Sequence, residues 1–218
     1  MNGILFRVRD FAIRLKAQTR AAVMVEMAFV VPVVVLLGFA GLEIAYLTLT
    51  TTKISETGLS AADNAARIAY GSNLALPQIR ERDVNDVFSG VEKQTGRLDF
   101  KQHGRLILSS LEQNPEGGQW IRWQRCFGDL AVASSYGDEG DGATGTSFPG
   151  MGEVDKEVKA SAGTAVMFVE IVYDYQPLAY GSWLGPKRIR STAAFNIREG
   201  RDLTRIYNAE GATVSRCQ

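Results

Sequence analysis

The chain has 218 residues, a length that suits one domain or two small ones. Its 24 basic and 24 acidic side chains cancel, so the composition gives no indication of a nucleic acid or an acidic ligand as a partner. The single histidine, His103, excludes any site that needs two or more histidines, and with them most zinc chemistry.

A basic leader precedes a long apolar run. Residues 1–20 hold five basic side chains against one acid, and residues 21–50 read AAVMVEMAFVVPVVVLLGFAGLEIAYLTLT. This order predicts a membrane-spanning helix whose N-terminal side lies in the cytoplasm, because basic residues flank such helices on the cytoplasmic side.

The length of the uncharged part determines how the helix can be placed across a membrane. No charge lies between Glu26 and Glu43, and at 1.5 Å per residue their separation is about 25 Å, a little short of a hydrocarbon core of ~30 Å. Counting the apolar flank to Leu49 makes the segment long enough. The two carboxylates are then expected near the two membrane interfaces.

Two other interpretations of the run remain. A secretory signal peptide has the same order, with small residues near Phe39–Gly41 as a cleavage site, but its apolar core usually has only ~7–15 residues. A buried helix of a soluble protein is less favoured, because VVPVVVLLGFAGL is apolar on every face.

The remaining chain predicts an α+β fold. A stripe of small and apolar residues extends the first helix to about Tyr70, ending at Gly71, and a second helical pattern follows Pro77. Alternating segments predict about four antiparallel strands, at 104–113, 118–127, 164–178 and 187–199. We therefore expect a basic leader (1–21), a transmembrane helix continuing as an amphipathic helix (22–70), and a small domain (71–218) with these strands and one or two further helices.

Few residues of the domain suggest chemistry. Residues 134–153 are rich in glycine and predict a long exposed loop. Trp120 and Trp123 should face opposite sides of their strand, one in the core and one exposed. Glu170 and Asp174 should share a strand face, which makes a paired-carboxylate site conceivable. The chain lacks G-x-S-x-G, phosphate-loop, H-E-x-x-H and C-x-x-C motifs, so we expect no catalytic residue, metal site or cofactor.

The two cysteines leave two alternatives. If the domain lies outside the cytoplasm, an even count makes a Cys126–Cys217 disulfide plausible. Two unpaired thiols are the other possibility.

The start of the apolar run resembles a known family. Residues 20–28, RAAVMVEMA, resemble the processing site of type IV-like prepilins. The run VEMAFVVPVVVLLGFAGLEIAYL, which includes Pro32, resembles the start of TadE-like minor pseudopilins of the tight-adherence (Flp) pilus system. The chain departs from the family pattern with alanine for glycine at Ala21 and methionine for an aromatic residue at Met27.

The resemblance implies a function and a set of partners. A prepilin peptidase would cut between Ala21 and Ala22, which places Glu26 at the fifth position of the mature chain. The protein would be a single-pass inner-membrane protein with its C-terminal domain in the periplasm. It would assemble with other pilins and pilus-assembly proteins, and would not itself be an enzyme.

Glu26 is the residue on which this expectation depends. A carboxylate and a new α-amine are each costly in lipid, so their pairing between neighbouring helices would favour assembly. The alternative is that Glu26 only reaches the cytoplasmic interface. An alternative for the whole chain is a membrane-anchored sensor or binding module that holds a ligand with the glycine-rich loop and the tryptophans.

Overall fold

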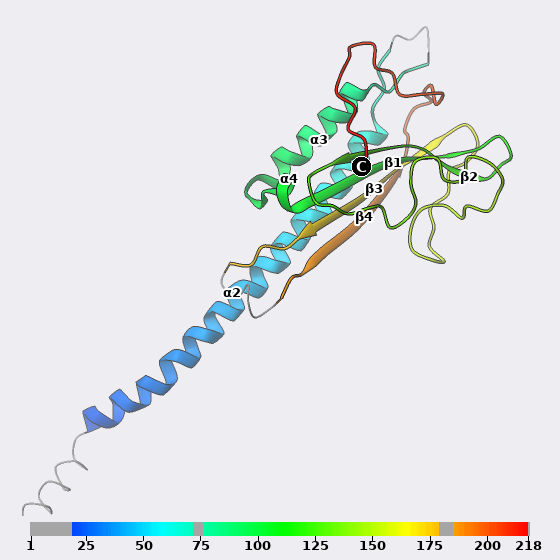
Figure 1. Cartoon of the computed structure of the whole chain (residues 1–218). Helices are drawn as coiled ribbons and strands as arrows, with labels where there is room; N and C mark the ends of the chain where they lie inside the picture. The colour runs from blue at the N-terminus through cyan, green and yellow to red at the C-terminus, as the bar shows by residue number, and fades with distance from the viewer. Residues whose placement is uncertain (1–18, 72–75, 179–184, 218) are drawn as a thin grey trace, which may run out of the picture. The chain divides into compact units, whose positions relative to one another are not determined.

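The computed structural model of the chain describes residues 19–71, 76–178 and 185–217, with side chains from Ala22 onward (Figure 1). The helices are α2 (Thr19–Ala66), α3 (Glu81–Thr95), the 3-10 turn η1 (Gly96–Leu98) and α4 (Phe100–His103). The strands are β1 (Gly104–Gln113), β2 (Gln119–Phe127), β3 (Ala165–Asp174) and β4 (Arg188–Asn196). The α+β fold class expected from the sequence is confirmed. Most of the basic leader lies outside the described residues.

Contacts divide the chain into two units, Met1–Tyr46 and Leu47–Gln218. Helix α2 belongs to both, since it runs without interruption through their boundary. The second unit, called the C-terminal unit here, holds the remaining elements.

Helix α2 ends at Ala66, four residues before the predicted end at Tyr70. The reason is a set of partners that the sequence pattern does not show. The backbone N–H of Arg198 donates to the carbonyl of Ala66, and the guanidinium of Arg201 donates to the carbonyls of Ala65 and Ile68. These partners donate to carbonyls at and just beyond the end of the helix, where no further helical N–H is available to bond to them.

The four strands form one antiparallel sheet in the order β2-β1-β3-β4. Side chains alternate between its two faces, so Val169 and Ile171 lie on one face and Phe168 and Glu170 on the other. We call the first the helix face, because Gly58 of α2 lies against Val169 and Ile171 there.

The other face, called the loop face, is covered by the segment between β2 and β3. Its core is a buried cluster to which the loop contributes Met151 and Ala160, with Tyr136 and Phe148 packed against it; the sheet contributes Leu111, Ile121, Val166 and Phe168. The C-terminal unit therefore has three layers, helices, sheet and loop.

The glycine-rich segment 134–153 is irregular and largely exposed, as expected, but a few of its residues are buried against the sheet, which the sequence did not predict. Met151 is fully buried, and the ring of Tyr136 meets that of Phe168 edge-on at 5.4 Å. Gly142 shows why glycine is needed: it has a positive φ of 74°, and a Cβ there would lie 2.0 Å from the carbonyl oxygen of Gln119. The glycines let this segment pack closely on the β1–β2 hairpin.

The expectation that Trp120 and Trp123 face opposite sides is also wrong. Ser110 pairs with Trp123 and Leu111 with Ile121, so Arg122 is an extra residue in β2. This bulge changes the alternation and turns both tryptophans to the helix face. Trp123 is buried and Trp120 half-buried.

Gly58 sets how closely α2 approaches the sheet. A Cβ built on it would lie 3.0 Å from Cγ2 of Ile171, tighter than ordinary van der Waals contact. Around it, Ile54, Ala61, Ala62 and Ala65 are buried. Small residues at this stripe allow the helix to lie directly on the aliphatic side chains of β3.

We expect Gly58→Leu to destabilise the C-terminal unit by roughly 1–3 kcal/mol, because the larger side chain overpacks the helix–sheet contact. Gly90→Leu is the matched control, since a Cβ on Gly90 of α3 meets nothing within 4 Å. Urea unfolding of the full chain in detergent, followed by tryptophan fluorescence, measures both variants. Equal stability of the two variants would contradict the close packing at Gly58.

Candidate membrane and assembly segment

The part of α2 in the first unit is long and apolar enough to cross a membrane. A window within Ala22–Ala66 reaches a mean hydropathy of 2.5, and none of that window is buried. Large apolar side chains are exposed all along it, among them Phe29 at 75% and Leu37 at 68%. Water does not favour such a surface, so a helix of this kind serves as a membrane anchor or a signal sequence.

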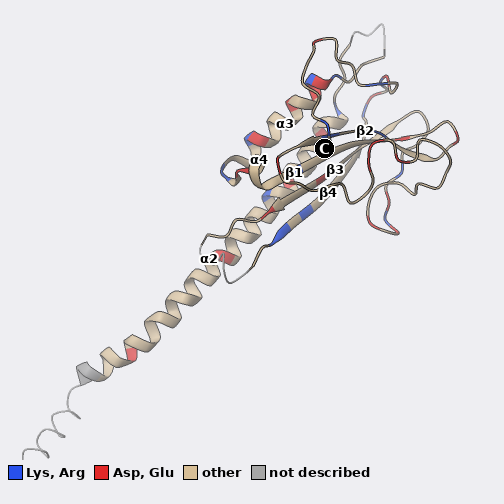
Figure 2. Ribbon diagram, viewed as in Figure 1, with Lys and Arg blue, Asp and Glu red and all other residues tan. Residues whose placement is uncertain are grey.

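The candidate residues from the sequence lie at the start of this segment. The backbone of Ala21 and Ala22 is helical, and the side chains of Glu26 and Met27 are exposed. Figure 2 shows that the ribbon carries no charge between Glu26 and Glu43. The side chain of Glu26 is exposed, and no described residue forms an ion pair with it. In lipid, such a group is costly without a partner.

Pro32 lies within α2, one and a half turns after Glu26. Because proline has no backbone N–H, it cannot donate to the carbonyl of Ala28. The segment therefore lacks one internal hydrogen bond and carries one exposed carboxylate, Glu26, near its start.

The polar tail at the end of the chain is fixed to the C-terminal unit. The N–H of Glu81 donates to the carbonyl of Tyr207, Asn85 bonds to Thr213 and Ser215, and the N–H of Cys126 donates to the carbonyl of Ser215. Cys126 and Cys217 form a disulfide, which is one of the two alternatives that the cysteine count left open. Sequence patterns missed this arrangement because the tail has no hydrophobic period and its partners lie far away in the chain.

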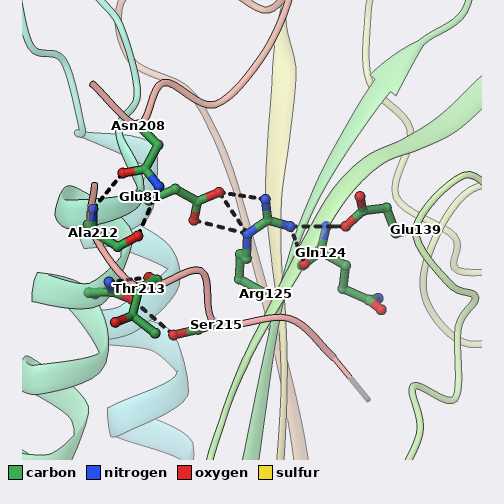
Figure 3. A network of polar contacts seen from close by, with 9 residues as sticks. Glu81, Gln124, Arg125, Glu139, Asn208, Ala212, Thr213 and Ser215 are labelled. Carbon is green, nitrogen blue, oxygen red and sulfur yellow. Dashed lines mark hydrogen bonds and ion pairs between the residues drawn. The ribbon is translucent and has the colours of Figure 1, made fainter. Parts of the chain in front are cut away.

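A buried ion pair joins α3 to β2 beneath this tail. Arg125 donates to both carboxylate oxygens of Glu81, at 2.6 to 3.1 Å, and to Glu139 of the loop at 3.0 Å (Figure 3). The side chains of Arg125 and Glu81 are only 7% and 4% exposed. Burial lowers the pKa of Arg125, but the two carboxylates outweigh burial and raise it. This pair fixes α3, β2 and the loop to one another.

Glu170 and Asp174 do not form a catalytic carboxylate pair. Glu170 is buried and accepts hydrogen bonds from Ser134, Ser135 and Arg190. Asp174 is paired instead with Arg188, whose hydrogen bonds lower the pKa of the Asp174 carboxyl. Each carboxylate already has a cation, so this face carries an ordinary pattern of strand ion pairs.

A shallow hollow of about 660 Å³ lies at one end of the sheet, lined among others by Asn114, Trp120, Arg122 and Arg201. Near it, burial raises the pKa of Glu112 to about 7 and lowers that of Arg201 to about 10. The glycine-rich loop packs on the loop face and both tryptophans lie on the helix face. The described residues therefore do not bring the loop and the tryptophans together as one ligand site.

Among the described residues, no group of three or more His, Cys, Asp or Glu side chains is placed to hold a metal ion.

We expect Glu81→Ala to cost about 3–5 kcal/mol of unfolding free energy, because it leaves the buried guanidinium of Arg125 without its main partner. Asp174→Ala removes the same kind of partner from the exposed pair with Arg188 and should cost less than about 1 kcal/mol. Urea unfolding of the full-length variants gives both values. A similar loss in the two variants would show that burial does not distinguish these pairs.

Comparisons with family models, with curated proteins and with solved structures each returned no match to this chain.

Proposed function

We propose that this protein is a single-pass inner-membrane protein that takes part in assembling a tight-adherence pilus, as a minor pilin-like component. The observation that supports this most directly is the exposed, uncharged stretch of α2 that begins at Glu26. A plain anchor does not need a carboxylate at this position. A subunit that must recognise a neighbouring helix in lipid has a use for one.

In this proposal the basic leader keeps the N-terminus in the cytoplasm and the C-terminal unit lies in the periplasm. The Cys126–Cys217 disulfide is compatible with that compartment, because disulfides persist in oxidising environments. A prepilin peptidase removes the leader between Ala21 and Ala22. The other partners are pilins and the membrane proteins of the assembly machinery.

Cleavage changes the charge at the start of the helix. It creates an α-ammonium at Ala22, one helical turn before Glu26 and on the same side of the helix. An ammonium and a carboxylate of neighbouring subunits neutralise each other in a medium of low dielectric constant, where an isolated charge is unfavourable. The pair thereby fixes the axial register between subunits.

The mature protein in the membrane fraction is expected to begin at Ala22, as measured by intact mass or N-terminal sequencing. Ala21→Leu should block processing because a branched side chain does not fit a cleft for a small residue, whereas Ala21→Gly should be cut. An intact Met1 in the unchanged protein would indicate a plain anchor. A start near residue 41 would indicate an ordinary secreted domain.

We expect Glu26→Gln to insert in the membrane as the unchanged protein does, yet to be incorporated into pili at least about tenfold less, because the ionic partner of the α-amine is lost. Glu56→Gln is the matched control, since Glu56 is an exposed acid of α2 beyond the apolar run. Immunoblots of membrane and sheared-pilus fractions measure the ratio. Unchanged piliation with Glu26→Gln would refute the assembly role.

A further inference from the structure

The two edges of the sheet differ in how their backbone groups are used. At the outer edge of β2, Ile121 exchanges hydrogen bonds with Gly140 and Asp141, the N–H of Gln124 donates to Glu139, and that of Cys126 donates to Ser215. The loop and the disulfide-linked tail thus cover this edge. Covering an edge strand is a usual way to prevent unwanted pairing.

The outer edge of β4 is not covered in this way. At one end of the β3–β4 ladder the N–H of Tyr175 donates to Lys187, and at the other the N–H of Ile197 donates to Ala165. Because hydrogen-bonded pairs alternate along an antiparallel ladder, the odd-numbered residues of β4 bond to β3. The even-numbered ones point their N–H and C=O groups outward: Arg188, Arg190, Thr192, Ala194 and Asn196.

We call these outward backbone groups the β4 edge. No described residue bonds to them, and the next even residue, Arg198, donates instead to Ala66. Most of their side chains are exposed, and residues 191–196 contain no charge and no proline. Beyond Arg188 and Arg190 this open edge carries no charge, so its outward backbone groups are a template for strand pairing.

The charges along the β4 edge indicate what the partner carries. Arg188 and Arg190 stand at its N-terminal end (Figure 2), and both side chains stay about half exposed while paired with Asp174 and Glu170. A guanidinium has five donors and can serve a second carboxylate. We propose that the β4 edge docks an extended strand of a different protein that runs antiparallel to β4 and carries carboxylates opposite Arg188 and Arg190.

A second copy of this chain does not fit the same edge, and this step rests on the membrane anchoring proposed above. Antiparallel pairing of β4 with β4 reverses the direction of the α2 segment Leu47–Ala66 between copies, whereas copies anchored in one membrane point the same way. Pairing of β4 with β2 keeps the direction, but β2 is covered. Among the antiparallel pairings this leaves strand addition by another protein, which is the occupant that we propose.

The test uses the full chain in detergent and a nine-residue peptide, TVTVTVEVE, whose glutamates lie opposite Arg190 and Arg188 in an antiparallel pairing. Hydrogen exchange is followed at single amides. We expect the peptide to slow exchange of the Arg190, Thr192 and Ala194 amides by roughly tenfold, with little change at Ser191 and Ala193, which already bond to β3. The peptide TVTVTVKVK should slow it much less.

Thr192→Pro should abolish the effect, because it removes an outward N–H while the ladder to β3 keeps all its bonds. Unchanged slow exchange at Ser191 and Ala193 shows that this variant folds. Arg188→Gln combined with Arg190→Gln should still bind the peptides but lose the preference for glutamate over lysine. This second variant tests the charges without altering the backbone.

Three results would overturn the inference. These are no slowing by either peptide, equal slowing by both, and protection without peptide that rises with protein concentration, which would identify a second copy as the occupant. Because the exchange is measured on the chain whether or not it has been processed, failure here leaves the mature N-terminus and the Glu26 variant as separate tests of the proposed function.

Discussion

The contact between α2 and β3 is the constraint on which the C-terminal unit depends. A helix packs this closely on a sheet only if its contact stripe is small, and Gly58 with the buried alanines provides that stripe. The apolar side chains of β3 can then bury one face under the helix and the other under the loop. The N-terminal part of the same helix is the exposed apolar segment. One helix therefore contributes both to the packed core and to an apolar surface.

The sequence predicted the elements that depend on local patterns. The strands were found within a few residues, because alternation and the turn at Asn114–Gly118 are local signals. Features fixed by distant partners were missed. The bulge at Arg122 reverses which face a tryptophan takes, the end of α2 is set by Arg198 and Arg201, and the buried pair of Glu81 with Arg125 joins residues 44 positions apart. At the candidate site, residues 21–32 were identified from their resemblance to a family and from the cost of a carboxylate in lipid.

The proposed function and the open strand edge concern different parts of the molecule and different kinds of recognition. In the proposed function Glu26 would act through charge in a medium without water, where one ion pair is decisive. The β4 edge acts through repeated backbone hydrogen bonds in water, where each bond contributes little and the register of the whole strand gives specificity. A protein with both would pair with neighbouring subunits through its helix and would bind a separate partner through its strand edge.

The disulfide-linked C-terminal tail affects whether the sheet can be extended by a second molecule. In this sheet β2 and β4 run in opposite directions, so β4 of one molecule and an uncovered β2 of the next would continue the sheet without a break. Residues 208–217 come later in the chain than every strand, and the disulfide holds them in place over part of β2. A molecule cut before them would keep the loop's bonds to Ile121 and Gln124 but would lose the bond at Cys126, so part of β2 would be open to a strand of the next molecule. The tail and its disulfide thus complete the cover that keeps β2 from extending the sheet into another molecule.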